Sequence, residues 1–157
     1  MNNAGGGAAQ MAHSFVKNHL HVIFSTKERH KLISKEMQPR LWAYMAGVCR
    51  NHGMFVGEIG GTDDHIHALI ELPSVLAPAK AVLLIKSNSS TWMNEQGIKF
   101  RWQEGYGAFS VSASNLAAVV KYIRNQENHH RKRSFEQEYL AFLRKHKVNF
   151  DPRYVFD

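Results

Sequence analysis

Apolar and polar residues alternate in four short stretches of this chain, and apolar residues recur at helical spacing in the segments between and after them. Alternation places every second side chain on the same face, so these stretches predict β-strands. Apolar residues three and four positions apart predict helices. The predicted strands are 19–25, 54–59, 65–72 and 108–112, and the predicted helices are 35–51, 79–95, 115–131 and a short one from 134.

The order of these elements is strand, helix, strand, strand, helix, strand, followed by two further helices. This order is typical of the ferredoxin-like α+β fold (βαββαβ), an antiparallel four-stranded sheet with its two helices on one face. The first and third strands are central neighbours in that topology. The other face of the sheet is expected to be bare, and such a face is a common platform for nucleic acid. The helix from 115 is an addition to the core pattern.

His65 and His67 lie two residues apart in the third predicted strand, so they project side by side from one face. The other face of that strand is an unbroken apolar row that needs a core beneath it: Ile66, Ala68, Ile70 and Leu72. The two imidazoles therefore form a clamp on the open face, which His21 of the first strand would share. Either pair alone, His65/His67 or His19/His21, is also explained by polar residues on a solvated face.

The predicted helix from Asn115 carries a second candidate group. One stripe is apolar and suited to packing, and the adjoining stripe holds Tyr122, Gln126 and His129. Residues four apart on a helix have Cβ atoms roughly 5 to 6 Å apart, so the Tyr122 hydroxyl and the Gln126 amide can address one small site. A tyrosine at the edge of the core is the simpler interpretation when Tyr122 is considered alone.

Composition sets outer bounds on the function. The chain has 157 residues, 44% of them hydrophobic and 21% charged, which fits one globular domain. No apolar run approaches the roughly 18 residues of a membrane helix, and a single cysteine, Cys49, excludes an internal disulfide, so we expect a cytoplasmic protein. A net charge of +7 and a pI near 9.7 favour a polyanionic partner, of which nucleic acid is the commonest.

Several motifs together resemble a known family. Asp-His-Ile-His at 64–67 precedes an apolar strand, Trp-Gln-Glu-Gly-Tyr follows at 102–106, and Tyr-Ile-Arg-Asn-Gln lies at 122–126; residues 21–27 complete the set. This ordered set resembles the single-tyrosine HUH transposases of the insertion-sequence-200/605 type, which move small elements as single-stranded DNA. The likeness runs from about Ser14 to His130. We expect a catalytic domain over 13–133, with a C-terminal helix and tail over 134–157 in the same domain. Residues 1–12, rich in glycine and alanine, predict a disordered tail on composition alone.

The resemblance implies a role for each motif residue. His65, His67 and Gln126 would bind a divalent metal, and Tyr122 would attack a phosphodiester to form a 5′-phosphotyrosine. A tyrosine has a pKa of about 10, so its ionisation near pH 7 costs roughly 4 kcal/mol, part of which a metal could offset by polarising the phosphate. Nitrogen and neutral oxygen ligands with open positions suggest Mg²⁺ or Mn²⁺, although two histidines would also accept Zn²⁺.

The same resemblance implies single-stranded DNA as the partner, with hairpin ends of an insertion element as its form, and a nucleoid-associated location. It also implies a homodimer whose sites combine histidines of one subunit with the tyrosine of the other, although one sequence leaves a site within a single chain equally open. Basic side chains could hold phosphates and aromatic ones could stack on unpaired bases. The candidates are His21, Lys27, Arg29, Lys86, Trp102, Tyr106, Arg131, Lys132 and Arg133.

Two other functions fit the same residues. A non-catalytic nucleic-acid-binding module, descended from a transposase, would use the bare sheet face without Tyr122. A metal-dependent hydrolase would use His65 and His67 with a metal-bound water, but no carboxylate is convincingly placed as its third ligand. Loss of a covalent DNA adduct on Tyr122→Phe would separate the transposase from both.

Overall fold

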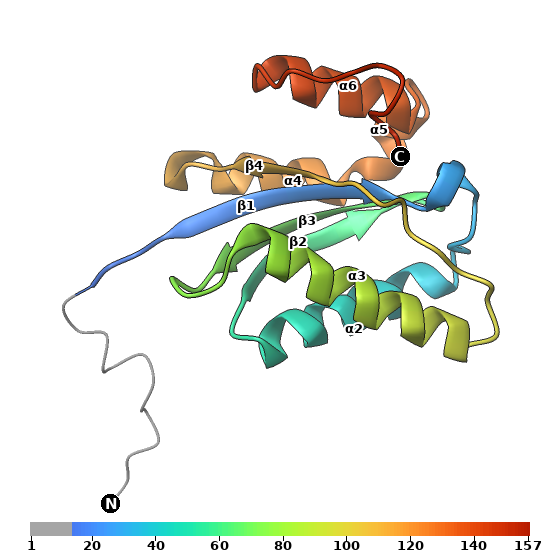
Figure 1. The fold of residues 1–157 in the computed structure, drawn as a ribbon, viewed down its shortest axis with the longest axis horizontal. Coiled ribbons are helices and arrows are strands. Elements are labelled where there is room, and N and C mark those ends of the chain that lie inside the picture. The colour runs from blue at the N-terminus through green and yellow to red at the C-terminus, as the bar shows by residue number, and fades with distance from the viewer. Residues whose placement is uncertain (1–13) are drawn as a thin grey trace, which may run out of the picture.

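The computed structural model describes residues 14–157, in which a four-stranded antiparallel sheet has the order β2-β3-β1-β4. Its strands are β1 Asn18–Ser25, β2 Phe55–Gly61, β3 His65–Leu72 and β4 Gly107–Ser110. β1 and β3 are central neighbours (Figure 1), so the predicted ferredoxin-like α+β fold is confirmed. The predicted tail over 1–12 lies outside the described residues.

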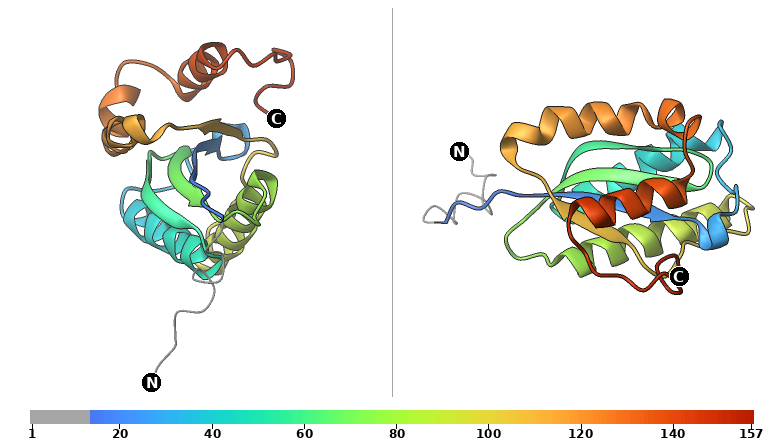
Figure 2. Two further views of the ribbon diagram at one scale, coloured as in Figure 1. Left: turned by 90° about the vertical axis from the view of Figure 1, so that its left-hand side faces the viewer. Right: turned by 90° about the horizontal axis from the view of Figure 1, so that it is seen from above.

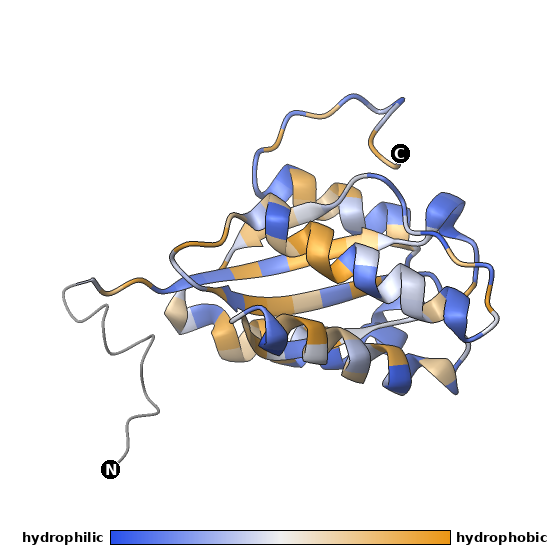
Figure 3. Cartoon of the chain, turned by 60° about the horizontal axis from the view of Figure 1, so that its bottom comes forward, coloured by the Kyte–Doolittle hydropathy of each residue, from blue (hydrophilic) through white to orange (hydrophobic). Residues whose placement is uncertain are grey.

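One face of the sheet is covered by the two helices that the ferredoxin-like pattern requires, α2 (Met37–Asn51) and α3 (Pro78–Glu95) (Figure 2). Hydrophobic and hydrophilic residues alternate along the strands (Figure 3). The apolar set packs with residues of these helices in one core. The main core includes Leu20, Val22 and Phe24 of β1 and Ile66, Ala68, Ile70 and Leu72 of β3. No helix of residues 14–157 combines the length and apolar composition needed to cross a bilayer.

The second face of the sheet is also covered, so the predicted bare face is wrong. Helices α4 (Leu116–Arg124), α5 (Gln126–His130) and α6 (Phe135–Lys145) lie on that side of the sheet (Figures 1 and 2). α6 begins at a capping box, in which the Ser134 hydroxyl accepts from the Gln137 amide. Its apolar stripe needs a partner, and it finds one on the sheet. This second core joins Ile23 and Phe109 to Phe135, Tyr139 and Leu143.

The single helix predicted over 115–131 is divided in the structure. A 3-10 turn, η2 (Ala113–Asn115), precedes α4, and Asn125 interrupts the helix with φ −101° and ψ 23°. The Asn125 amide donates to the Tyr122 carbonyl, three residues back, as at many helix ends. Tyr122 and Gln126 therefore lie on different helices and approach the sheet independently.

A glycine on β2 determines how closely α4 approaches the sheet. Gly60 lies opposite His67 in the β2–β3 register. A Cβ atom at position 60 would lie 2.9 Å from the carbonyl oxygen of Ile123, so only a residue without a side chain fits there. α4 thus rests on the backbone of β2, directly beside the histidine strand.

We therefore predict that Gly60→Ala lowers the free energy of unfolding by about 1 to 3 kcal/mol, because the new methyl group must push α4 from the sheet. Gly47→Ala is the matched control, since the nearest atom to a Cβ there is 3.9 Å away, in the middle of α2. That control should gain about 0.5 to 1 kcal/mol. Urea unfolding measures both, and equal effects of the two variants would contradict the close approach.

Candidate active site

His65 and His67 face the second core and are completely buried, contrary to their predicted place on an open face. His65 Nδ1 lies 2.7 Å from a carboxylate oxygen of Asp64 and 3.0 Å from the Thr62 hydroxyl. Burial alone would raise the pKa of Asp64, but its contacts with His65, Thr62 and His130 together outweigh burial and lower the pKa. With its Nδ1 atom facing Asp64, His65 directs its Nε2 atom inward, toward Gln126.

His67 is oriented by His21. The pairing of His21 with Leu69 makes His21 a diagonal neighbour of His67 across β1 and β3. The Nε2 atom of His21 lies 2.7 Å from Nδ1 of His67, and both rings are buried. Burial lowers the pKa of His21 to about 3 and that of His67 to about 4, so both are neutral at pH 7. His21, predicted to face DNA, instead fixes the ring of His67.

Glu138 of α6 lies at the centre of the site. Its Oε1 atom is 2.8 Å from Nε2 of His67 and 3.2 Å from Nε2 of His130, while its Oε2 atom accepts from the Tyr122 hydroxyl. Burial alone would raise the pKa of Glu138, but hydrogen bonds from His130 and His67 outweigh it and hold the pKa far below its usual range. Glu138 is thus a buried anion at neutral pH.

Tyr122 reaches this cluster from α4. Its ring stacks on His129 at a centroid distance of 4.4 Å, and its hydroxyl donates to Glu138. Burial first, and then the charge of Glu138, raise the pKa of Tyr122 above its usual value. The hydroxyl therefore keeps its proton at neutral pH, and a cation nearby would favour the ionised form.

The donor atoms fit a metal ion. One ligand atom from each of His65, His67, His130 and Glu138 lies within 4.8 Å of all the others. The Gln126 amide oxygen, from α5, is 3.0 Å from Nε2 of His65. This oxygen therefore lies close enough to His65 to join the same set of donor atoms. Nitrogen and oxygen donors of this kind suit Mn²⁺, Zn²⁺ and Mg²⁺.

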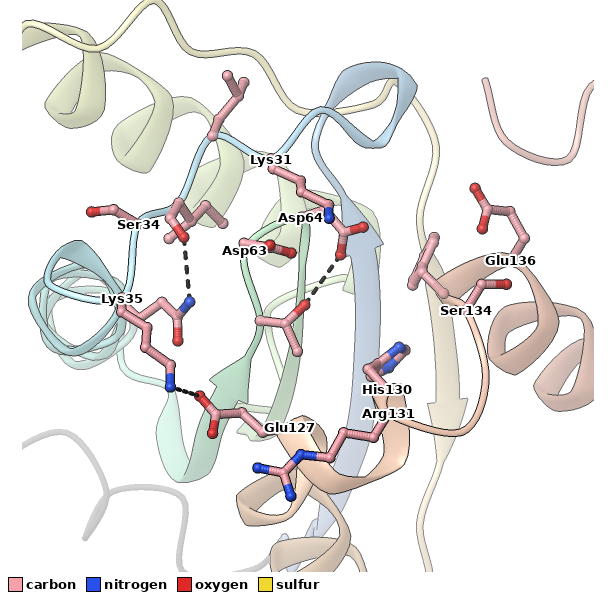
Figure 4. A pocket seen from close by; sticks show the side chains of 15 residues that line it. Lys31, Ser34, Lys35, Asp63, Asp64, Glu127, His130, Arg131, Ser134 and Glu136 are labelled. Atoms are coloured by element: carbon pink, nitrogen blue, oxygen red, sulfur yellow. Dashed lines mark hydrogen bonds and ion pairs between the residues drawn. The ribbon is translucent and has the colours of Figure 1, made fainter.

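Two cavities flank the cluster. The larger has a volume of about 730 Å³, and its lining includes Asp64, His130, Arg131 and Phe135 (Figure 4). The second, of about 350 Å³, lies on the opposite side, where His21, Tyr122 and Arg133 contribute to its wall. Buried as it is, the cluster is therefore bordered by solvent on two sides.

Several predicted DNA contacts have structural partners instead. The Lys86 ammonium donates to the carbonyl oxygens of Gln103, Glu104 and Gly105, and burial lowers its pKa to about 8. Trp102 is only 7% exposed and packs in the main core, where its indole donates to Ser89. The prediction that Trp102 stacks on bases is therefore wrong, because Trp102 lies on the face of the sheet that α2 and α3 cover.

The other predicted DNA contacts differ in how far they are exposed to solvent. Arg29, in the turn η1 (Lys27–Arg29), pairs with Glu136 and lies over the Phe156 ring at 5.1 Å. Lys27 is half-buried, and Tyr106 is 36% exposed. Among the predicted DNA contacts, three basic residues are exposed, and they lie between α5 and α6: Arg131, Lys132 and Arg133.

The sequence pattern missed Glu138 and His130. Positions 135, 138, 139, 142 and 143 form one face of α6, and Glu138 is the charged residue among them. A charge in an otherwise apolar stripe was the available signal for a buried polar site. His130 was hidden in a basic run that is ordinarily solvated.

The fold and this cluster can now be compared with known proteins. The family model described as "Transposase IS200 like" matches residues 14–126. The chain belongs to the IS200-like transposase family. Transposases of insertion sequence element IS200 from Salmonella typhimurium and Salmonella typhi are each 26% identical over 129 residues, which cover 77% of this chain and 84% of theirs.

Two solved structures share the fold. A protein from Deinococcus radiodurans, provisionally assigned as a transposase, aligns with a TM-score of 0.59 and 21% identity over 80% of this chain and 98% of that one. A REP-associated tyrosine transposase bound to a REP hairpin aligns with a TM-score of 0.59 and 16% identity over 74% of this chain and 71% of that one. The family match ends at Gln126, so Glu138 lies beyond it.

The hydrogen bond between His21 and His67 yields a prediction of stability. His21→Leu leaves Nδ1 of the buried His67 without its partner, which should lower the free energy of unfolding by about 1 to 3 kcal/mol. His19→Leu is the control, since His19 is on the same strand face but only half-buried, and it should change stability by about 0.5 kcal/mol or less. Urea unfolding compares the two, and equal losses would argue against an orienting role for His21.

Proposed function

We propose that this protein is a metal-dependent transposase that nicks and rejoins single-stranded DNA through Tyr122. The observation that carries the proposal is that the Tyr122 hydroxyl contacts Glu138, which also contacts His67 of a buried His65/His67/Gln126 cluster, inside a chain of the IS200-like transposase family. The hairpin-bound transposase of the same fold supports DNA hairpin ends as the substrate. Such a substrate would bring the protein to the nucleoid.

Each residue has a defined part in the proposed reaction. The Tyr122 oxygen would attack the phosphorus atom, the bond to the 3′ oxygen would break, and a 5′-phosphotyrosine and a free 3′ hydroxyl would result. Attack by the 3′ hydroxyl of another strand would reverse the step and release the tyrosine. Because one phosphodiester replaces another, no nucleotide cofactor is required.

His65, His67 and Gln126 would hold the metal ion, which we propose to be Mg²⁺ or Mn²⁺. When bound, such an ion polarises the phosphate and offsets the negative charge that develops on its oxygens. Asp64 and His21 would keep the two ligand imidazoles in the correct tautomer. Arg131, Lys132 and Arg133 are the exposed cations best placed to hold the DNA backbone, because they border the two cavities or the turn between them.

We also propose that the whole site belongs to one chain. α4 lies over its own sheet, with Ile123 seated on Gly60, so Tyr122 meets the histidines of its own subunit. This differs from the shared sites expected from the family resemblance. The reason is geometric, since the short turn between β4 and α4 returns the helix directly over β2.

A metal-dependent hydrolase is the second candidate, because the structure brings a carboxylate beside the two histidines, whereas the sequence alone indicated no such third ligand. His65, His67 and Glu138 form a two-histidine, one-carboxylate set. A metal-bound water would then replace Tyr122 as nucleophile, and no covalent adduct would form.

The nucleophile can be tested with single-stranded oligonucleotides in Mn²⁺ on a denaturing gel. DNA labelled at its 3′ end should migrate with the protein, while DNA labelled at its 5′ end should be released as a shorter free strand. Tyr122→Phe should abolish the adduct. Tyr154→Phe, at an exposed tyrosine, should leave it unchanged.

Cleavage that persists in Tyr122→Phe, with neither label on the protein, would favour the hydrolase. An adduct that persists in Tyr122→Phe would assign the nucleophile elsewhere. Salt-sensitive binding without any cleavage by the unaltered protein would indicate a binding module.

Mixing two inactive variants tests whether one chain builds the site. We expect that His65→Ala and Tyr122→Phe proteins remain inactive together, because each chain would still lack one essential group. The measurement is adduct formation after the two proteins are co-refolded, with the separate proteins as controls. Recovery of about a quarter or more of the unaltered activity would show that subunits share their sites.

A further inference from the structure

We propose that Glu138 is the anionic ligand of the metal ion and that it reaches the ion from the C-terminal helix α6. The inference rests on the proposed function, since it takes the ion to be bound at His65 and His67. It adds a ligand that lies beyond the residues matched by the family model. It also makes the metal a link between α6 and the sheet.

The separations between donor atoms suit one ion. The Oε1 atom of Glu138 lies 2.8 Å from Nε2 of His67 and 3.8 Å from Nε2 of His65, which is itself 3.0 Å from the Gln126 oxygen. An octahedral ion with bonds of about 2.1 Å separates adjacent ligands by about 3.0 Å and opposite ligands by about 4.2 Å. These four side chains can therefore share an ion with small shifts, and two positions would remain for a phosphate oxygen and water.

Charge favours the same assignment. Two imidazoles and an amide are neutral, so an ion bound by them alone would keep its full charge in a buried place, which is costly. Glu138 has no exposed surface and supplies a carboxylate, and Mg²⁺ and Mn²⁺ prefer carboxylate oxygen. Its oxygens also contact His67, His130 and Tyr122.

The packing of α6 explains why the carboxylate is placed so accurately. Phe135 and Tyr139 flank Glu138 on the buried side of the helix and pack on the sheet. A Cβ atom on Gly107 of β4 would lie 2.9 Å from the Tyr139 ring, so the ring rests on bare backbone there. The helix is thus fitted to the sheet on both sides of the proposed ligand.

His130 has a different role from Glu138, since it positions ligand oxygens. Its Nε2 atom lies 3.1 Å from the Gln126 oxygen and 3.2 Å from Oε1 of Glu138, so one N–H faces two acceptors. This arrangement identifies His130 as a donor that positions both oxygens. Its loss should weaken metal binding less than the loss of Glu138.

The test measures Mn²⁺ binding to the full chain by titration calorimetry and by electron paramagnetic resonance of free Mn²⁺. Glu138→Gln keeps the shape of the side chain and removes its charge, and Glu136→Gln makes the same charge change at a partly exposed position of α6, where the carboxylate pairs with Arg29. We expect Glu138→Gln to weaken binding by at least about tenfold, as even outer partners of metal ligands do. Glu136→Gln should remain within about twofold of the unaltered chain.

Hydrogen exchange provides a second, local measurement. Mn²⁺ should slow amide exchange in residues 139–145 of the unaltered chain and of His130→Gln, and that slowing should vanish in Glu138→Gln. Binding within twofold and unchanged protection of α6 in Glu138→Gln would overturn the proposal.

The same experiment separates this inference from the proposed function. If His65→Ala loses Mn²⁺ while Glu138→Gln retains it, the histidine site stands and only the role of Glu138 fails. If the unaltered chain binds no Mn²⁺, the metal-dependent function fails, and Glu138 with it.

Discussion

The carboxylate of Glu138 lies without exposed surface between His67, His130 and the hydroxyl of Tyr122. A buried charge is tolerated only when it is paired or hydrogen-bonded, so the three partners and the helix that carries Glu138 depend on one another. Displacement of α6 would leave the imidazoles unpaired, and loss of the imidazoles would leave an anion in an apolar core. The candidate site and the packing of the C-terminal region therefore depend on the same contacts.

The sheet lies between two packed layers of helices. Below it, the apolar faces of α2 and α3 bury the alternate residues of β1 and β3 and fix their register. Above it, that register sets His21 diagonally beside His67, and His67 lies opposite Gly60 of β2. Since the histidines stand on central strands of a packed sheet, their separation is held by the main core rather than by the site itself.

Membership of the IS200-like family accounts for the part of the site up to Gln126, and α6 adds what lies beyond it. α4 and α5 approach the cluster from two directions because Asn125 breaks the helix between Tyr122 and Gln126. The second core then closes α6 over them. In this chain α6 covers the candidate site and also contributes a residue to it.

Much of this protein was determined by local sequence. Alternation along 19–25 and 65–72 established the strands, the inward row from Ile66 to Leu72 and the common face of His65 and His67, because the period of two is a property of any extended chain. The capping box at Ser134 marked the start of α6 for an equally local reason. The ordered motifs up to Gln126 identified the family.

Only the tertiary structure decided what covers the histidines and what completes the cluster. The apolar stripe of Phe135, Tyr139 and Leu143 shows that α6 must pack, but not on which face, because any apolar surface would satisfy it. Glu138 is separated from His65 by more than seventy positions, and no local sequence pattern can predict a contact between residues so far apart in the chain. Burial on Ile23 and Phe109 decided it, and the covering of that face withdrew His21 from the surface, while Trp102 is buried in the main core on the other face.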